Sequence, residues 1–103
     1  MTLAEIKVML ETTGLPVAYS AFPEGAAPPL PYICYVVTGS NNFVADGIVY
    51  QPVQAIDIEL YTRQKDPASE AAVEAALAAL PWEKTELYLD DEKCVQVTYE
   101  IEV

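Results

Sequence analysis

The feature that most constrains the fold is a strict alternation of apolar and polar side chains near the C-terminus. Within the strand expected over residues 93–103, residues 95–103 put only apolar side chains on one side and only polar ones on the other: Val95, Val97, Tyr99, Ile101 and Val103 against Gln96, Thr98, Glu100 and Glu102. Residues 54–62 repeat the pattern, with Ile56, Ile58 and Leu60 against Asp57, Glu59 and Tyr61. A period of two indicates strands with one buried side. The chain is therefore expected to build a sheet with one covered and one open face.

Further strands are expected where aromatic and β-branched residues gather, at residues 17–22, 32–38, 48–50 and 85–89. Asp90-Asp91-Glu92 is expected to join the last two strands as a hairpin turn. Residues 39–42 and 45–47 are predicted to be turns, with Phe43 and Val44 as an exposed elbow between them. Four prolines in residues 23–31 predict an extended loop there.

Two helices are predicted. Thr2 and Glu5 have the spacing of a capping box, which predicts a helix over residues 3–12 that Gly14 ends. Asp66-Pro67 predicts the start of a second helix over residues 67–80, which is rich in alanine and stops at Pro81. The predicted fold is a single α+β domain over residues 1–103. It has a mainly antiparallel sheet with two helices packed on one face, in the order α-β-β-β-α-β-β.

Composition limits the functions that the chain can have. Its 103 residues carry a formal net charge of −11 and include no histidine. The negative charge disfavours binding to nucleic acid or to an anionic membrane, because both depend on lysine and arginine. Without histidine, serine, threonine and cysteine have no imidazole partner, and the four glycines form no phosphate-binding loop. We therefore expect no enzyme activity, no catalytic residue, no cofactor and no metal site.

The polar sides of the two alternating strands gather four carboxylates: Asp57, Glu59, Glu100 and Glu102. They form either an ordinary solvated sheet face or an electronegative surface that serves to repel other anions or to act as an acidic partner. Catalysis by paired carboxylates is disfavoured, because an i, i+2 spacing on open strands offers no pocket.

Four residues are candidates for contacts with a partner. Phe43 and Asn42 belong to the loop over residues 39–47, Pro29 to the proline-rich loop, and Tyr61 to the acidic sheet face. Amphipathic aromatic side chains and exposed apolar tips are enriched at protein contacts, although each of these residues can equally serve packing. Cys34 and Cys94 are expected to be reduced, buried thiols.

The order of motifs along the chain resembles the small tail-completion, or tail-terminator, proteins of long-tailed bacteriophages and prophages. The resemblance extends over nearly the full length. It rests on short segments: Leu15-Pro16-Val17-Ala18-Tyr19, Pro28-Pro29-Leu30-Pro31-Tyr32, Asn41-Asn42-Phe43-Val44-Ala45-Asp46, Ile56-Asp57-Ile58-Glu59-Leu60-Tyr61-Thr62, Lys65-Asp66-Pro67 with Glu70, and Tyr99-Glu100-Ile101-Glu102.

The resemblance implies a structural virion protein at the head-proximal end of the tail, made in the bacterial cytoplasm. Its subunits would form a ring, commonly of six copies, that ends polymerisation of the tail tube and docks the head. Its partners would be itself, the tail-tube protein and the head–tail connector proteins. Asp57, Glu59, Glu100 and Glu102 are then candidates for the ring's lumen, because carboxylates repel the passing DNA. Two alternatives stay open: a head-side neck connector or stopper, and an acidic mimic of DNA that inhibits a nucleic-acid enzyme.

Overall fold

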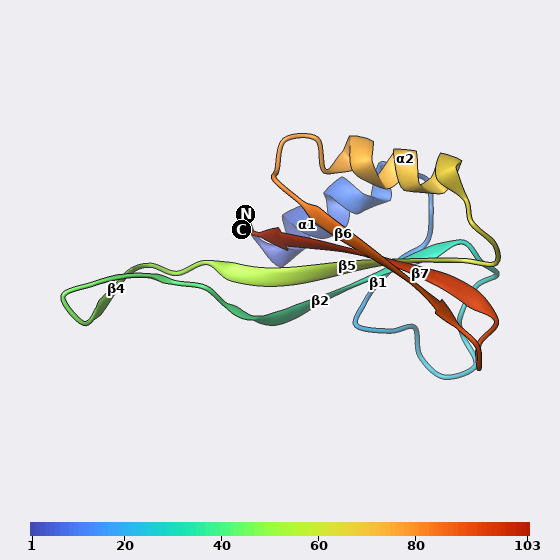
Figure 1. The fold of residues 1–103 in the computed structure, drawn as a ribbon, viewed down its shortest axis with the longest axis horizontal. Coiled ribbons are helices and arrows are strands. Elements are labelled where there is room, and N and C mark those ends of the chain that lie inside the picture. The colour runs from blue at the N-terminus through green and yellow to red at the C-terminus, as the bar shows by residue number, and fades with distance from the viewer.

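The computed structural model describes residues 1–103 and every side chain except that of Tyr50. Two helices, α1 (Leu3–Glu11) and α2 (Pro67–Ala76), accompany seven strands, as Figure 1 shows. The strands are β1 (Val17–Tyr19), β2 (Tyr32–Ser40), β3 (Phe43–Ala45), β4 (Ile48–Gln51), β5 (Gln54–Thr62), β6 (Glu83–Leu89) and β7 (Cys94–Glu102).

The main sheet has five strands in the order β1-β2-β5-β7-β6. Only β1 and β2 run parallel, and the other neighbours are antiparallel. The strands β3 and β4 form a separate two-stranded sheet. In the main sheet the elements follow the predicted order α-β-β-β-α-β-β, and the predicted α+β class is confirmed.

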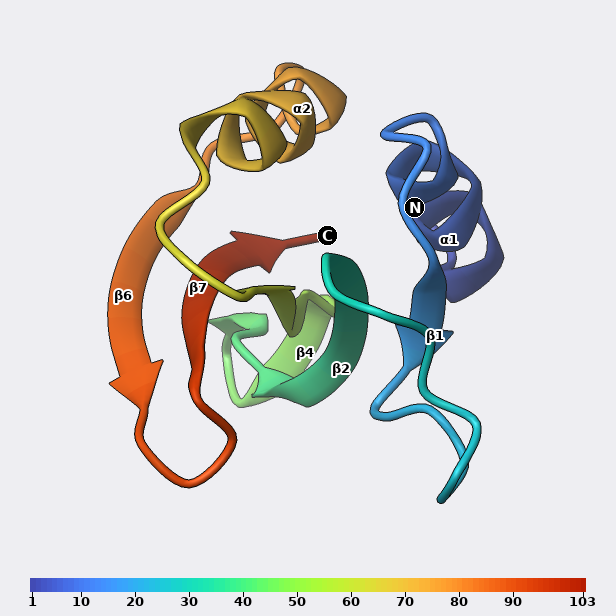
Figure 2. The ribbon, with the colours of Figure 1, turned by 90° about the vertical axis from the view of Figure 1, so that its right-hand side faces the viewer.

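Both helices cover the same face of the sheet (Figure 2). Ile6 and Leu10 of α1 and Val73 and Leu77 at α2 are fully buried against it. From the sheet, the core takes the apolar sides of the two alternating strands, including Ile56, Ile58, Leu60, Val97, Tyr99 and Ile101. The period-two pattern therefore predicted correctly which residues of these strands face the core.

The helix starts follow their capping residues. The Thr2 hydroxyl accepts from the Glu5 N–H at 3.1 Å, and the Glu5 carboxylate accepts from the Thr2 N–H at 2.9 Å. At α2, the Asp66 carboxylate accepts from the Ser69 N–H at 3.1 Å. These contacts satisfy N–H groups that have no partner within the helix.

The second helix is shorter than predicted, because it ends at Ala76 and not at residue 80. After it, Ala78 and Leu80 donate to carbonyls only three residues back, Ala75 and Leu77, so the chain tightens into turns. Pro81 disfavours helical backbone at Leu80, just before it, and the chain must turn within these residues to enter β6 at Glu83.

Several strand boundaries also differ from the prediction. The first strand stops at Tyr19, because Ser20 has a left-handed backbone with φ of 64°. The second continues to Ser40, through residues predicted to be a turn, and its register shifts between Val37 and Gly39. The strand expected from residue 85 already begins at Glu83. Its first two residues were missed because Pro81 and two charged side chains interrupt the apolar pattern.

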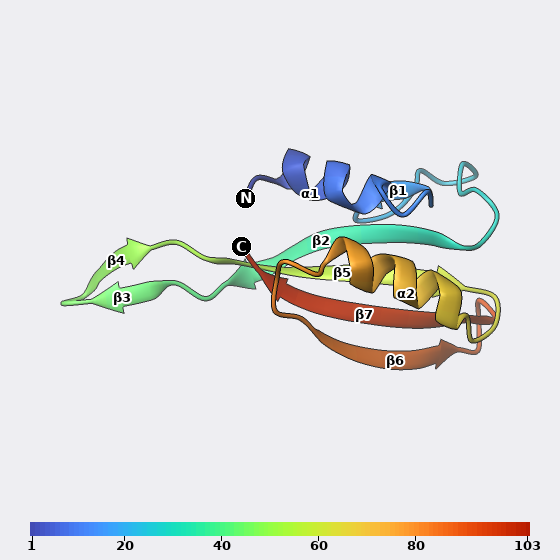
Figure 3. The same ribbon diagram turned by 90° about the horizontal axis from the view of Figure 1, so that it is seen from above.

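The segment expected to be an elbow at Phe43 and Val44 is instead the strand β3 of a hairpin with β4. Asp46 and Gly47 form its turn with φ of 54° and 74°, the backbone that a tight two-residue hairpin turn requires. Residues 41–53, called the arm below, extend well beyond the helices and the main sheet (Figure 3). The molecule is accordingly elongated, with extents of 48 × 26 × 23 Å.

A cluster of ion pairs ties α2 to the sheet edge. The carboxylate of Glu70 is buried and contacts Lys65 at 2.7 Å and Lys84 at 3.1 Å. Lys84 also contacts Glu74 at 2.8 Å, and the Tyr99 hydroxyl donates to Glu74 at 2.9 Å. Burial alone would raise the pKa of Glu70, but the hydrogen bonds from both lysines lower it below its ordinary value.

Candidate functional site

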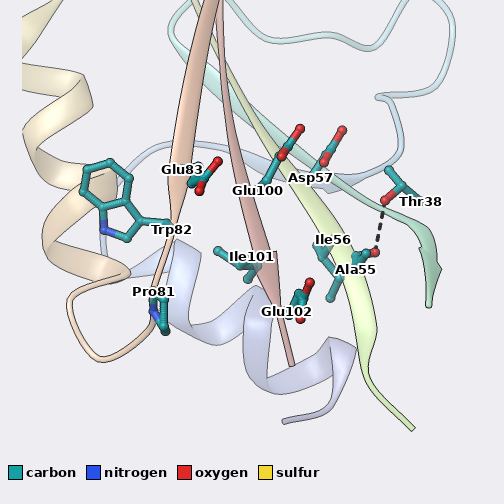
Figure 4. A pocket seen from close by; sticks show the side chains of 10 residues that line it. All are labelled: Thr38, Ala55, Ile56, Asp57, Pro81, Trp82, Glu83, Glu100, Ile101 and Glu102. Atoms are coloured by element: carbon teal, nitrogen blue, oxygen red, sulfur yellow. Dashed lines mark hydrogen bonds between the residues drawn. The ribbon is translucent and has the colours of Figure 1, made fainter. Parts of the chain in front are cut away.

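The face of the sheet opposite the helices gathers carboxylates in a line. Asp57 on β5 lies directly opposite Glu100 on β7, and Glu100 lies directly opposite Glu83 on β6. Residues paired in this way project to the same face of a sheet. The three side chains, called the acidic row below, stand side by side in Figure 4.

Two of the predicted acidic residues belong to the acidic row, and a third lies beside it. Glu102 is two residues beyond Glu100 on the same strand, and its carboxylate accepts a hydrogen bond from the Asn41 side chain at 3.0 Å. Glu83 was not expected on this face, because the strand was predicted to start at residue 85, two residues later. The hairpin register would have revealed it, because Glu83 falls opposite Glu100 once the turn over residues 90–93 is fixed.

The acidic row borders an open groove of about 720 Å³, called the acidic groove below. Trp82 and Pro81 line one side of it, and Thr38 lies on the other, as Figure 4 shows. Its charged lining residues are all carboxylates: Asp57, Glu83, Glu100 and Glu102.

Ion pairs do not neutralise the acidic row. Every ion pair found among the described residues joins Lys65 or Lys84 to Glu70, Glu74 or Glu86. Like charges directly opposite each other across strands destabilise a sheet. The row therefore gives this face a strongly negative potential, which repels polyanions and attracts basic groups.

Glu59 has different surroundings from the acidic row. It is half-buried, lies opposite Cys34 and Thr98, and its carboxylate accepts a hydrogen bond from the Tyr61 hydroxyl at 3.2 Å. Burial raises the pKa of Glu59, and the hydrogen bond from Tyr61 opposes that shift. The four carboxylates that the sequence placed on one face thus divide into an acidic row with Glu102 and a separate, partly buried Glu59.

Tyr61 belongs to an aromatic cluster at the far end of the open face. Its ring lies 5.4 Å from that of Tyr32, which lies 5.0 Å from that of Phe22. The Tyr61 hydroxyl also accepts from the Gln96 side chain at 2.9 Å, and burial raises the pKa of Tyr61 to about 12. Its hydroxyl is therefore neutral at physiological pH and acts as a donor to Glu59.

These rings and the proline-rich loop border a second open groove of about 490 Å³, called the aromatic groove below. Pro29, exposed in that loop, is part of its wall, and the charged residues that line it are Arg63 and Glu92. Cys34 and Cys94 also line it as buried, reduced thiols, and their strands are separated by β5. Burial raises the pKa of the Cys34 thiol to about 11.

Asn42 and Phe43 lie where the arm begins. The Asn42 side-chain oxygen accepts from the Val53 N–H at 3.0 Å, and the Asn41 N–H donates to the Val53 carbonyl at 2.8 Å. These hydrogen bonds join the two segments of the chain that enter and leave the arm at its base. Beyond them the arm exposes large apolar side chains, with exposed fractions of 61% for Phe43, 55% for Val44, 64% for Ile48 and 49% for Val49.

Within the described residues, no group of three or more carboxylate or thiol side chains is arranged to hold a metal ion. None of the described helices is long and apolar enough to cross a membrane.

Comparison with known proteins gives no family. A scan against protein-family models finds no match, and a search of curated proteins finds no significant relative.

Proposed function

We propose that the chain is a structural subunit of a long phage or prophage tail. In this proposal, copies form a ring at the head-proximal end of the tail, stop polymerisation of the tail tube and present a surface to the head. The proposal agrees with the resemblance described above. The observation that carries it is the division of the surface into a negatively charged sheet face and a projecting apolar arm.

The arm supports assembly with other subunits. An isolated two-stranded hairpin is marginally stable in water, and apolar side chains exposed on one are typical of protein contacts. Three of its side chains, Val44, Ile48 and Val49, are about half or more exposed in the single chain. Burial of these side chains against another subunit would remove apolar surface from water and stabilise the arm.

The acidic row supports a passage for DNA. In the proposed ring, Asp57, Glu100 and Glu83 face the lumen, with Glu102 beside them. Phosphates are repelled by carboxylates, so the genome moves through without binding. The absence of ion pairs to this row, in the described part of the chain, leaves the repulsion undiminished at short range.

The acidic row also favours one alternative of a different class, a DNA mimic that inhibits a nucleic-acid enzyme. A line of uncompensated carboxylates imitates a phosphate backbone in charge. In that case the face binds a basic protein, and the apolar arm has no role in a ring. A neck connector or stopper on the head side is a third possibility, distinguished by whether the chain binds the tube or the head.

Tube assembly tests the proposal. Tail-tube protein from the genome that encodes this chain is polymerised with and without the chain, and tube lengths are measured by electron microscopy. We expect shorter tubes with the chain present and a distinct density at one end. Unchanged lengths and bare ends would overturn the proposal.

A charge-reversed variant separates tube capping from DNA passage. Asp57→Lys with Glu100→Lys changes two members of the acidic row and should leave tube lengths shortened as by the unchanged chain. In assembled particles the same variant should reduce delivery of DNA. Full infectivity of such particles would refute the assignment of this face to the lumen.

A further inference from the structure

The arm is apolar on both of its faces. Val44 lies opposite Val49, and Ala45 lies opposite Ile48 in the next pair along the hairpin. Successive side chains of a strand point to opposite faces, so each face carries one of these pairs. Strands with apolar residues on both faces are typical of segments that are covered on both sides. The arm therefore fits inside a groove better than flat on a surface.

The arm carries a single charge. Within residues 41–53 the only ionisable acid or base besides tyrosine is Asp46, which lies at the turn. A groove that receives the arm must accept apolar side chains along its length and a carboxylate at its tip.

The two grooves of the molecule differ in this respect. The acidic groove carries four carboxylates and no cation, so it would repel Asp46. The aromatic groove has a mainly apolar wall, formed by Phe22, Pro28, Pro29, Leu30, Tyr32 and Tyr61. It also contains Arg63, which forms no ion pair within the described residues, together with Glu92 at another point of its lining.

We propose that the arm of one copy docks in the aromatic groove of the next copy, with Asp46 placed beside Arg63. This inference rests on the proposed function and names the contact by which the ring is built. The charge of Asp46 selects the aromatic groove over the acidic groove, and the apolar pairs of the arm match the rings and prolines of its wall.

The positions of the two surfaces determine the type of assembly. The arm forms one end of the elongated molecule, and the loop and turns that border the aromatic groove form the other (Figure 1). A contact between two different surfaces is heterologous, so each bound copy offers a free arm and a free groove to further copies. Such a chain of contacts closes into a ring when the rotation per subunit permits it.

A charge exchange tests the pairing. Asp46→Arg alone and Arg63→Asp alone should each raise the protein concentration needed for half-assembly about fivefold, as measured by analytical ultracentrifugation. The double variant should return toward the concentration of the unchanged chain, because the pair is restored with its signs exchanged. The pairing would be overturned if the two single substitutions weakened assembly equally and their effects added in the double variant.

Cross-linking tests the contact without relying on charge. A Val49→Cys chain and an Ala27→Cys chain, both altered at exposed or half-exposed positions of the arm and the groove, are mixed under mild oxidation. We expect a disulfide-linked pair of the two different chains. Ala4→Cys, exposed on α1, replaces Ala27→Cys in the control and should give no such pair. The unchanged chain, oxidised in the same way, shows whether any disulfide forms through the native Cys34 or Cys94.

The outcomes separate this inference from the proposed function. A ring that forms without the Val49–Ala27 link, or with equal linking to Ala4→Cys, overturns the docking of the arm and leaves the ring intact. Tube lengths that do not change in the assembly experiment overturn the proposed function, whatever the cross-linking shows.

Discussion

Replacement of Glu70 by glutamine tests the ion-pair cluster that holds α2 on the sheet. Glu70→Gln keeps the size and one acceptor oxygen of the side chain but removes its charge. Glu70 is only 5% exposed, and its carboxylate contacts both Lys65 and Lys84. The variant therefore leaves two ammonium groups without their buried counter-charge.

The expected loss follows from these contacts. A buried hydrogen bond to a charged group contributes about 1.5–3 kcal/mol. The lysine side chains are 52% and 34% exposed, so water screens part of each contact, and the glutamine oxygen retains part of one. We expect Glu70→Gln to lower the free energy of unfolding by about 2 kcal/mol at pH 7, which corresponds to about 8–10 °C in Tm for a domain of this size.

Urea denaturation followed by circular dichroism measures the difference, with Glu86→Gln as the matched control. Glu86 contacts Lys65 at 2.6 Å but is 43% exposed, so its loss should cost less than about 0.5 kcal/mol. Equal losses for the two variants would refute the reasoning, because burial of Glu70 would then have no special effect.

The pH dependence follows from the sign of the shift. The pKa of Glu70 is lowered in the folded chain, so its stabilisation is fully present above its ordinary value of 4.5 and is lost as the pH falls through the lowered value. The unchanged chain and Glu70→Gln should therefore differ most near neutral pH and converge in acid. A difference that stayed constant down to pH 2 would contradict the assignment.

Three further predictions concern the core, the open face and the arm. Ile58→Ala, at a fully buried core position, should lower the free energy of unfolding by about 3–4 kcal/mol in urea denaturation. Glu59→Gln should stabilise the chain at pH 7, because burial raises the pKa of Glu59 and its ionisation therefore costs stability. Thermal unfolding should show that this gain in stability disappears as the pH falls toward 4.5. Val44→Ser with Val49→Ser should change the unfolding free energy by less than about 1 kcal/mol while reducing assembly in ultracentrifugation, and a normal assembly curve would exclude the arm from the contact.

The alternating strands were the part of the fold that sequence could predict best. A period of two assigns every side chain of β5 and β7 to a face, and a slip by one residue would bury Asp57 and Glu100. The capping box of Thr2 and the N-cap Asp66 followed by Pro67 likewise fixed both helix starts, because their hydrogen bonds are local.

Boundaries that depend on distant contacts were harder to predict. Gly39 and Ser40 are residue types that favour turns, yet they remain in β2 because β5 pairs with them. The C-terminal end of α2 depends on the turn into β6, which no local periodicity reveals. Tertiary pairing outweighs local preference at these positions.

The candidate site was predictable in composition but not in arrangement. Sequence alternation placed Asp57, Glu59, Glu100 and Glu102 on one face, whereas the register between strands decided which of them lie together. That register brings Glu83 into the acidic row and places Glu59 beside Tyr61. In the arm, a strand was expected at residues 48–50, where β4 lies, but Phe43 and Val44 were expected only as an exposed elbow, because two residues are too few to predict a strand by themselves.

The most direct test of the central claim, that the chain functions as a ring of identical subunits, is its mass in solution by light scattering over a range of concentrations and salt. Salt screens the repulsion between subunits that each carry a charge of −11, so it should promote assembly. The account predicts a closed species that appears with concentration and salt, at about 68 kDa for six copies of the 11.3 kDa chain. A mass of 11.3 kDa under every condition would contradict it.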